Sequence, residues 1–414
     1  MNVKRNELLK ALKQCLPGID SGKSVLEGAD LFVFKKGFVH SYNDVISVAV
    51  PIKAEGFLGA DIEGAVRAEE FYGIINKFAG DVISFEAHKG KWVLKSGRAT
   101  AALTLMAGDF AGRFDNIAPS PEKWAALPSE FSQGLGVCRM SANKSGISGL
   151  YITAADIMSS DGYQVNHFKW AGPEGLGALW ISDAAAGELL KAGALSHIQH
   201  KGTWVSFKTL DGTVFSVRTL QSEMYPFEKL ANVLEAHRRM KEQLAAKFPK
   251  ALVDAIDRAS SFCLNIADSR AVRLLISRQG IAVTAERASG NFEETVEWEE
   301  EMPKFKALEL YVDTGMILFA ARRSLAFRIC EKDGDLSLVF ATDQSVHLMS
   351  TFAKDEAESA QPEPEKAAPG NLYDEGEEAE RPAKKRGSKA SPALDSAEDG
   401  ADEDECDLDD ADEE

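Results

Sequence analysis

The order of predicted elements recurs three times along residues 1–353, with a period of roughly 120 residues. Each copy opens with an amphipathic helical segment and continues with short segments in which apolar and polar residues alternate, as is typical of strands. A second helical segment, a hairpin and a final strand complete the copy. The first helical segments fall at 5–16, 128–141 and 249–264, and the second at 67–78, 182–194 and 312–324. The recurrence predicts three α+β units, each with two helices and two small antiparallel sheets.

The turns between the short segments support strands. Gly37, Gly90, Gly212 and Gly334 each follow Lys or Asp between two alternating runs, and such pairs suit tight hairpin turns that need positive φ. The predicted closing hairpins are 82–87 with 91–95, 197–200 with 204–208, and 327–331 with 336–340, followed by strands at 99–106, 213–220 and 345–352. We therefore expect domains at 1–117, 118–236 and 237–353.

The negative charge is concentrated at the end of the chain. The formal net charge is -18, but residues 354–414 carry 23 acids and 7 bases, which leaves residues 1–353 close to neutral. The tail is poor in aromatic residues and rich in Pro, Ser, Ala and acids, so it cannot bury enough apolar surface to offset its ordering entropy. We expect 354–414 to be a disordered acidic tail, and the body can still present a basic face to nucleic acid.

Several classes of protein are disfavoured. No long apolar run predicts a membrane span, and residues 1–16 carry helically spaced charges in place of a signal peptide, so we expect a soluble, cytoplasmic protein. The five cysteines lie far apart without a CxxC pair, and four of them, Cys15, Cys138, Cys263 and Cys330, are expected to be buried apolar residues.

No motif for catalysis is present. The chain has no nucleophile elbow, no phosphate loop and no zinc protease motif, and neither a metal nor a cofactor is expected. His197 and His200 are spaced three apart on a predicted strand, which points them to opposite faces. We expect a protein that is not an enzyme, although a small α+β hydrolase or transferase using His197, His200 and Asp161 stays an alternative.

What stands out is a set of bases on the predicted helices. Lys10 and Lys13 lie three apart opposite a leucine stripe, and further bases fall on or beside later helices. Each could be an ordinary solvated residue, so a nucleic-acid interface requires the units to assemble with these faces turned the same way.

Four segments resemble the bacterial DNA polymerase III β sliding clamp family, in a divergent form of the kind that a phage encodes. They are 158–165 (MSSDGYQV), 212–220 with 224–227, 270–276 with the strands to 298, and 95–105 with Phe110 and Phe114. Their order agrees with the threefold repeat. The sequence departs from the family at Tyr163 and Gln164, where the family has histidine and arginine, and at 348–352, where it ends differently.

The resemblance implies a DNA sliding clamp, that is, a processivity factor without catalytic activity. Two chains would join head to tail into a six-domain ring around double-stranded DNA, which would be gripped without regard to sequence. The implied partners are the replicative DNA polymerase, the clamp loader and a second copy of the chain. The implied DNA-binding residues are Arg5, Lys10, Lys13, Lys23, Arg67, Lys77, Arg139, Lys144, Lys191 and Arg258.

The resemblance also implies a groove for partner peptides between the second and third domains. Its walls would be Ile147, Ser160, Gly162, Tyr163, Gln164, Val165, Pro226, Leu230, Ala231, Val346 and Leu348. The aliphatic members of this set could equally be plain core. A third alternative is a DNA-associated protein other than a clamp, in which the acidic tail is the active part.

Overall fold

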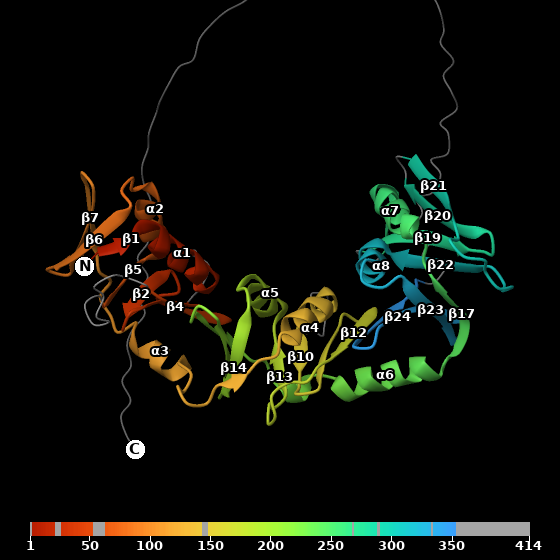
Figure 1. The fold of residues 1–414 in the computed structure, drawn as a ribbon, viewed down its shortest axis with the longest axis horizontal. Coiled ribbons are helices and arrows are strands. Elements are labelled where there is room, and N and C mark those ends of the chain that lie inside the picture. Colours follow the sequence, from red (N-terminus) through yellow and green to blue (C-terminus); the bar gives the residue numbers. More distant parts are fainter. Residues whose placement is uncertain are drawn as a thin grey trace, which may run out of the picture. The chain divides into compact units, whose positions relative to one another are not determined.

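The computed structural model describes residues 2–20, 26–52, 63–142, 148–266, 269–287, 290–332 and 334–352. Lys23, Lys144, Ile147, Cys406 and the tail 354–414 lie outside these ranges. Within the described chain, the predicted order of elements is confirmed three times. Figure 1 shows the resulting helix pairs, α1 with α2, α4 with α5, and α7 with α8.

The first repeat contains two sheets and a helix pair, and it is followed by a short linking helix. Its strands are β1 (Asn2–Lys4), β2 (Leu31–Lys35), β3 (Phe38–Tyr42), β4 (Ile46–Pro51), β5 (Gly64–Arg67), β6 (Val82–His88), β7 (Lys91–Ser96) and β8 (Ala99–Thr104). Its helices are α1 (Arg5–Cys15) and α2 (Ala68–Lys77), and α3 (Gly112–Ile117) lies in the link.

The second repeat has the same plan with a longer linking helix. Its strands are β9 (Ala125–Ala126), β10 (Leu150–Ile152), β11 (Asp156–Ser160), β12 (Gln164–Lys169), β13 (Leu179–Ile181), β14 (Leu195–Lys201), β15 (Trp204–Thr209) and β16 (Val214–Arg218). Its helices are α4 (Glu130–Cys138) and α5 (Asp183–Lys191), and α6 (Phe227–Arg239) follows in the link. The expected domain boundary at 236/237 falls inside α6.

The third repeat completes the series. Its strands are β17 (Lys241–Lys247), β18 (Leu264–Ile266), β19 (Ser269–Ile276), β20 (Gly280–Arg287), β21 (Gly290–Glu297), β22 (Leu308–Asp313), β23 (Ala326–Lys332), β24 (Asp335–Ala341) and β25 (Ser345–Ser350). Its helices are α7 (Lys250–Ala259) and α8 (Thr314–Ala321). Short 3₁₀ turns η1 (Leu16–Gly18), η2 (Arg139–Ser141), η3 (Ser222–Met224) and η4 (Ser260–Phe262) follow α1, α4, β16 and α7.

The sheets join across the repeats, which the sequence did not predict. Strand β4 of the first repeat pairs with β16 of the second, and β12 of the second pairs with β25 of the third, both antiparallel. Two eight-stranded sheets result, β5-β2-β3-β4-β16-β15-β14-β9 and β13-β10-β11-β12-β25-β24-β23-β17. We call these contacts the first junction (β4–β16) and the second junction (β12–β25).

Helices pack on one face of the sheets, and α1 is a clear amphipathic example. In α1, Leu8, Ala11, Leu12 and Cys15 are buried at helical spacing, and the helix packs on β3 and β4. The four cysteines of the repeats are buried as expected, and burial raises the pKa of the Cys15 thiol, whose Sγ lies 3.3 Å from the carbonyl oxygen of Val39. The predicted turn chemistry is confirmed at Lys36 and Lys89, with φ of 49° and 45° before a glycine.

Candidate nucleic-acid interface and partner groove

The first junction brings three of the predicted DNA-binding lysines together. Because β4 pairs with β16, helix α1 of the first repeat lies beside the end of α5 of the second. Lys10, Lys13 and Lys191 line one groove of about 520 Å³ between these helices. Lys191 forms an ion pair with Glu188 at 2.7 Å, whereas Lys10 and Lys13 have no acidic partner among the described residues. Their ammonium groups are therefore available to an anionic ligand such as a phosphate chain.

Arg5 and Lys77 lie at the C-terminal end of α2. The Arg5 guanidinium donates hydrogen bonds to the carbonyl oxygens of Ile75 at 3.0 Å and Asn76 at 2.6 Å. These are carbonyls at the helix end, which lack partners inside the helix and which attract positive charge. Arg5 therefore fixes α2 against the start of α1, and Lys77 is exposed beside it.

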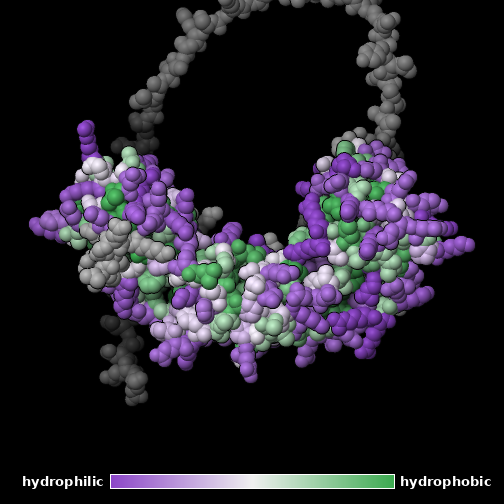
Figure 2. All heavy atoms as spheres, viewed as in Figure 1, coloured by the Kyte–Doolittle hydropathy of each residue, from purple (hydrophilic) through white to green (hydrophobic). Residues whose placement is uncertain are grey.

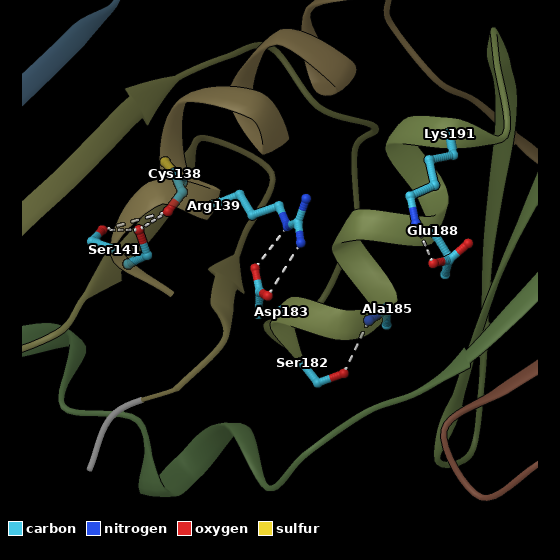
Figure 3. A network of polar contacts seen from close by, with 9 residues as sticks. Cys138, Arg139, Ser141, Ser182, Asp183, Ala185, Glu188 and Lys191 are labelled. Carbon is cyan, nitrogen blue, oxygen red and sulfur yellow. Dashed lines mark hydrogen bonds and ion pairs between the residues drawn. The ribbon is translucent and has the colours of Figure 1, made fainter. Parts of the chain in front are cut away.

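Arg139 is held in an ion pair between two helices (Figure 3). Its Nε lies 2.8 Å from Oδ1 of Asp183, the first residue of α5, and a second guanidinium nitrogen lies 3.3 Å from Oδ2. Gly187 leaves room for the guanidinium, since a Cβ there would stand 2.8 Å from it. Arg139 thus joins the end of α4 to the start of α5.

Two other predicted bases also have acidic partners. Arg67 lies 3.2 Å from Asp30, and Arg258 lies 2.7 Å from Glu294 of β21. The hydrogen bonds that the Arg258 guanidinium donates to the Glu294 carboxylate raise the pKa of Arg258, so the guanidinium stays charged. Both pairs are at the surface, so a polyanion could compete for these arginines.

Arg323 ends the last predicted helix but was not included in the predicted DNA-binding set. At the end of α8, its guanidinium donates to the carbonyl oxygen of Gly136 in α4 at 2.8 Å and lies 3.8 Å from the Phe319 ring centroid. At the first junction, the lysine-lined groove lies between α1 and α5. The equivalent helices at the second junction are α4 and α8, and Arg323 lies between them. Its position after a helix gave only a weak signal, because the contact with Gly136 is 187 residues away in the chain.

The predicted partner-groove residues lie at the second junction. Asp161 is buried and accepts hydrogen bonds from the backbone N–H groups of Tyr163 and Gln164, and from the Gln164 side chain at 2.9 Å. The side-chain oxygen Oε1 of Gln164 lies 2.8 Å from Nε2 of His347 on β25. Gly162, at φ 89°, allows this tight loop, and Ser160 accepts a hydrogen bond from its N–H. Tyr163 is 42% exposed near Phe352.

The aliphatic members form one cluster beneath α6. Val165 pairs with Leu348 across the junction, and both pack with Leu230 of α6 and with Tyr225. Val346 packs at the edge of this cluster, while Pro226 precedes α6 and Ala231 is half-buried within it. The structure thus brings the described members of the predicted groove together, with Val165, Leu230 and Leu348 largely covered.

An aromatic group beside this cluster was not predicted. Tyr151 stacks on Tyr225 with ring centroids 4.9 Å apart, and Phe227 and Trp180 pack on the same pair. The aromatic run in 225–227 was the available signal, but the partner strands lie far away in the sequence.

The elements of the enzyme alternative do not gather into a site. His197 contacts Ser196 and the Trp124 ring, whereas Asp161 is engaged with Gln164 at the second junction. Within the described ranges no group of three or more His, Cys, Asp or Glu side chains is arranged for a metal ion. No helix in the described residues is long and apolar enough to cross a membrane.

Solved structures with the same fold are sliding clamps. The DNA polymerase sliding clamp from Bacillus subtilis matches with a TM-score of 0.70 at 15% identity, covering 85% of this chain and 98% of that one. The DNA polymerase III β chain from Streptococcus pneumoniae has 0.70 at 14%, covering 85% and 99%, and the β subunit from Thermotoga maritima has 0.66 at 14%, covering 85% and 98%. No family model and no curated protein sequence matches the chain. The chain therefore has the sliding-clamp fold over almost the full length of those proteins.

Proposed function

We propose that this protein is a DNA sliding clamp, a processivity factor that encircles duplex DNA and does no chemistry itself. The observation that carries the proposal is the repeated junction, because a module that joins to its own next copy twice in one chain can join again between chains. The shared fold with clamps supports it. The three units would be those bounded near residues 117 and 236.

The free sheet edges indicate how a ring would close. Each repeat has a first sheet and a second sheet. At each internal junction, the third strand of the first sheet of one repeat (β4 or β12) pairs with the last strand of the second sheet of the next repeat (β16 or β25). In the described residues, the corresponding strands without an outer neighbour are β21 in the third repeat and β8 in the first. Antiparallel pairing of β21 with β8 of a second copy repeats the internal junctions and gives a head-to-tail homodimer ring.

The two edges complement each other. If β21 and β8 pair in the register of the internal junctions, Phe292 of β21 lies opposite Leu103 or Ala101 of β8. All three side chains then lie on the face of the sheet that the helices cover. On the outer face, β21 carries exposed Glu293 and Glu297, while Arg98 lies in the turn of the β7–β8 hairpin and Lys95 lies on β7, where Glu86 pairs with it at 2.7 Å. Opposite charges across the contact favour this pairing over the pairing of like edges.

Inside such a ring, the helix bases would supply a sequence-independent attraction to phosphates. Lys10, Lys13 and Lys191 are the strongest candidates because they share one groove. Arg5, Lys77, Arg67, Arg139 and Arg258, with Lys23 and Lys144 outside the described residues, complete the proposed set. Replicative polymerase and clamp loader would dock by peptides at the second junction, near Tyr163, Pro226 and Val346.

A test of the lumen uses the triple variant Lys10→Glu, Lys13→Glu, Lys191→Glu. The affinity for a nicked circular duplex should fall, and the slope of log affinity against log salt should flatten by about two to three, as expected for three lost phosphate contacts. The matched control reverses the exposed Lys304, Lys306 and Lys332, which lie outside the helices, and should change the slope by less than about one. Equal slopes for the triple variant and the native protein would contradict the lumen assignment.

A test of encirclement compares circular with linearised DNA after loading. A clamp is retained on a closed circle and slides off a linear duplex, and removal of residues 354–414 should leave this difference intact. Loss of DNA association on removal of the tail would favour the alternative in which the tail is the active part, and turnover that depends on His197 or His200 would favour an enzyme.

A further inference from the structure

An apolar groove lies on the outer face of the first junction, on the side of the sheet away from α1. Its volume is about 430 Å³. Its floor is Phe38, Ala49 and Val214 of the joined sheet, and its wall is Phe114 and Ile117 of α3. None of these residues belongs to the helix faces or to the proposed partner groove of the second junction.

The second junction shows what covers the equivalent surface. There, α6 spans thirteen residues and places Leu230 and Leu234 against the outer side chains of β12, β24 and β25. The linking helix of the first junction, α3, is visibly shorter than α6 (Figure 1). It spans six residues, and its Phe114 packs toward β2 and β5. In the described ranges, no helix covers the surface of the first junction that corresponds to the one covered by Leu230 and Leu234 at the second.

The floor of the groove behaves as apolar surface. The His40 ring lies 4.6 Å from that of Phe114 and 6.0 Å from that of Phe38. Burial and the nearby Lys35 lower the pKa of His40 to about 4, so the imidazole is neutral at physiological pH. Such a floor favours aliphatic or aromatic side chains of a ligand.

The rim of the groove is basic. Lys35 is held by Asp115 at 2.8 Å and so adds little net charge. Lys36 is exposed at the turn beside it, and Lys201 reaches the carbonyl oxygen of Ala118 at 2.8 Å. Among the described residues around the groove, the bases therefore outnumber the acids, and a ligand with acidic groups beside its apolar ones would be complementary.

We propose that this groove is a second docking site, which takes a short peptide segment of a partner protein carrying two or three large apolar side chains flanked by acidic residues. The apolar side chains occupy the surface between Phe114 and Val214, as Leu230 and Leu234 do at the second junction. The acidic flank lies toward Lys36 and Lys201. The site goes beyond the clamp function, since it requires neither a ring nor DNA.

The test measures fluorescence anisotropy with the full-length protein and a labelled peptide, Glu-Leu-Ala-Asp-Leu-Phe-Asp-Glu. The expected result is saturable binding that is lost when Leu, Leu and Phe of the peptide are replaced by serine. Ala49→Glu places a charge on the floor and should weaken binding at least about tenfold. Lys36→Asp, at an exposed turn with positive φ that Asp tolerates, should weaken it about threefold without disturbing the core.

The matched control is Leu210→Glu, an exposed apolar position outside both grooves, which should leave binding unchanged, and Val346→Glu shows whether the peptide binds at the second junction instead. Thermal unfolding of each variant identifies loss of fold, and the Lys36→Asp result decides the matter if Ala49→Glu is unfolded. No binding of the peptide, binding that is indifferent to both groove variants, or binding abolished by Val346→Glu alone would overturn the proposal. None of these results bears on ring closure or DNA retention.

Discussion

At the scale of single residues, the second junction depends on a buried polar chain. Asp161, Gln164 and His347 link the loop before β12 to β25, and all three are nearly inaccessible to water. Nε2 of His347 is bonded to Gln164, whereas its Nδ1 is buried without a partner among the described residues. Burial and the nearby Arg323 lower the pKa of His347 to about 3, so its imidazole is neutral at physiological pH.

This lowered pKa predicts a loss of stability in mild acid. The unfolded chain binds a proton near pH 6.5 and the folded one only near pH 3, so the contribution is present above pH 6.5 and is lost as the pH falls. Between pH 7 and pH 5 the free energy of unfolding should drop by about 2 kcal/mol through this residue. Urea unfolding of native protein and His347→Gln at both values measures the effect. An equally steep loss in the variant would contradict it.

At the scale of elements, the close packing of α4 on its sheet requires a glycine at one position of the helix. A Cβ on Gly134 would stand 2.6 Å from Cδ1 of Ile157 and 2.7 Å from Cδ1 of Phe168, so this glycine lets α4 lie directly on β11 and β12. Gly136, two residues later, has only Arg323 near it, at 4.0 Å. The sequence pattern Gly-Leu-Gly thus combines one glycine required by packing with one that packing does not require.

The two glycines make a matched pair of variants. Gly134→Ala should destabilise the protein by about 1–3 kcal/mol, because overpacking outweighs the better helix propensity of alanine. Gly136→Ala should stabilise it by about 0.5–1 kcal/mol, because only the propensity changes. Denaturant unfolding of both proteins gives the comparison. Stabilisation by both substitutions would show that α4 does not need the close approach.

At the scale of the whole molecule, one kind of β-strand contact joins successive repeats, and the proposed ring would use it again between chains. The two junctions within the chain are β4–β16 and β12–β25, and among the described residues β21 and β8 are end strands that the proposed contact between chains would pair. Polar and charged residues cover most of the visible surface, with smaller apolar patches between them (Figure 2). Assembly should thus depend on two specific edges.

Charge reversal on one edge should weaken this assembly. Glu293→Lys with Glu297→Lys places four bases on the outer face of the contact, and we expect the dimer dissociation constant to rise about tenfold. Adding Lys95→Glu with Arg98→Glu should return the dissociation constant to its native value, because the two edges then again carry opposite charges. Sedimentation velocity over a concentration series measures both. Failure of the second pair to restore association would contradict the β21–β8 contact.

Local patterns predicted the repeated elements well, and long-range contacts account for what was missed. The helix pairs and hairpins follow from leucine spacing and Lys-Gly or Asp-Gly turns, which are signals within a few residues. The β4–β16 and β12–β25 pairings join strands more than 150 residues apart, and no local pattern marks them. For the same reason, the sequence showed that Arg139 lies on a helix but not that Asp183 holds it.

The acids on β21 have a consequence for chains that have not yet met a partner. An exposed edge strand can pair with the edge strand of any other chain, and in a solution of one protein the same edge of another copy is always present. With Glu293 and Glu297 exposed along β21, two such edges repel each other when brought together. The acids thereby disfavour pairing of two β21 edges, which leaves the proposed contact of β21 with β8 of a second copy as the better matched one.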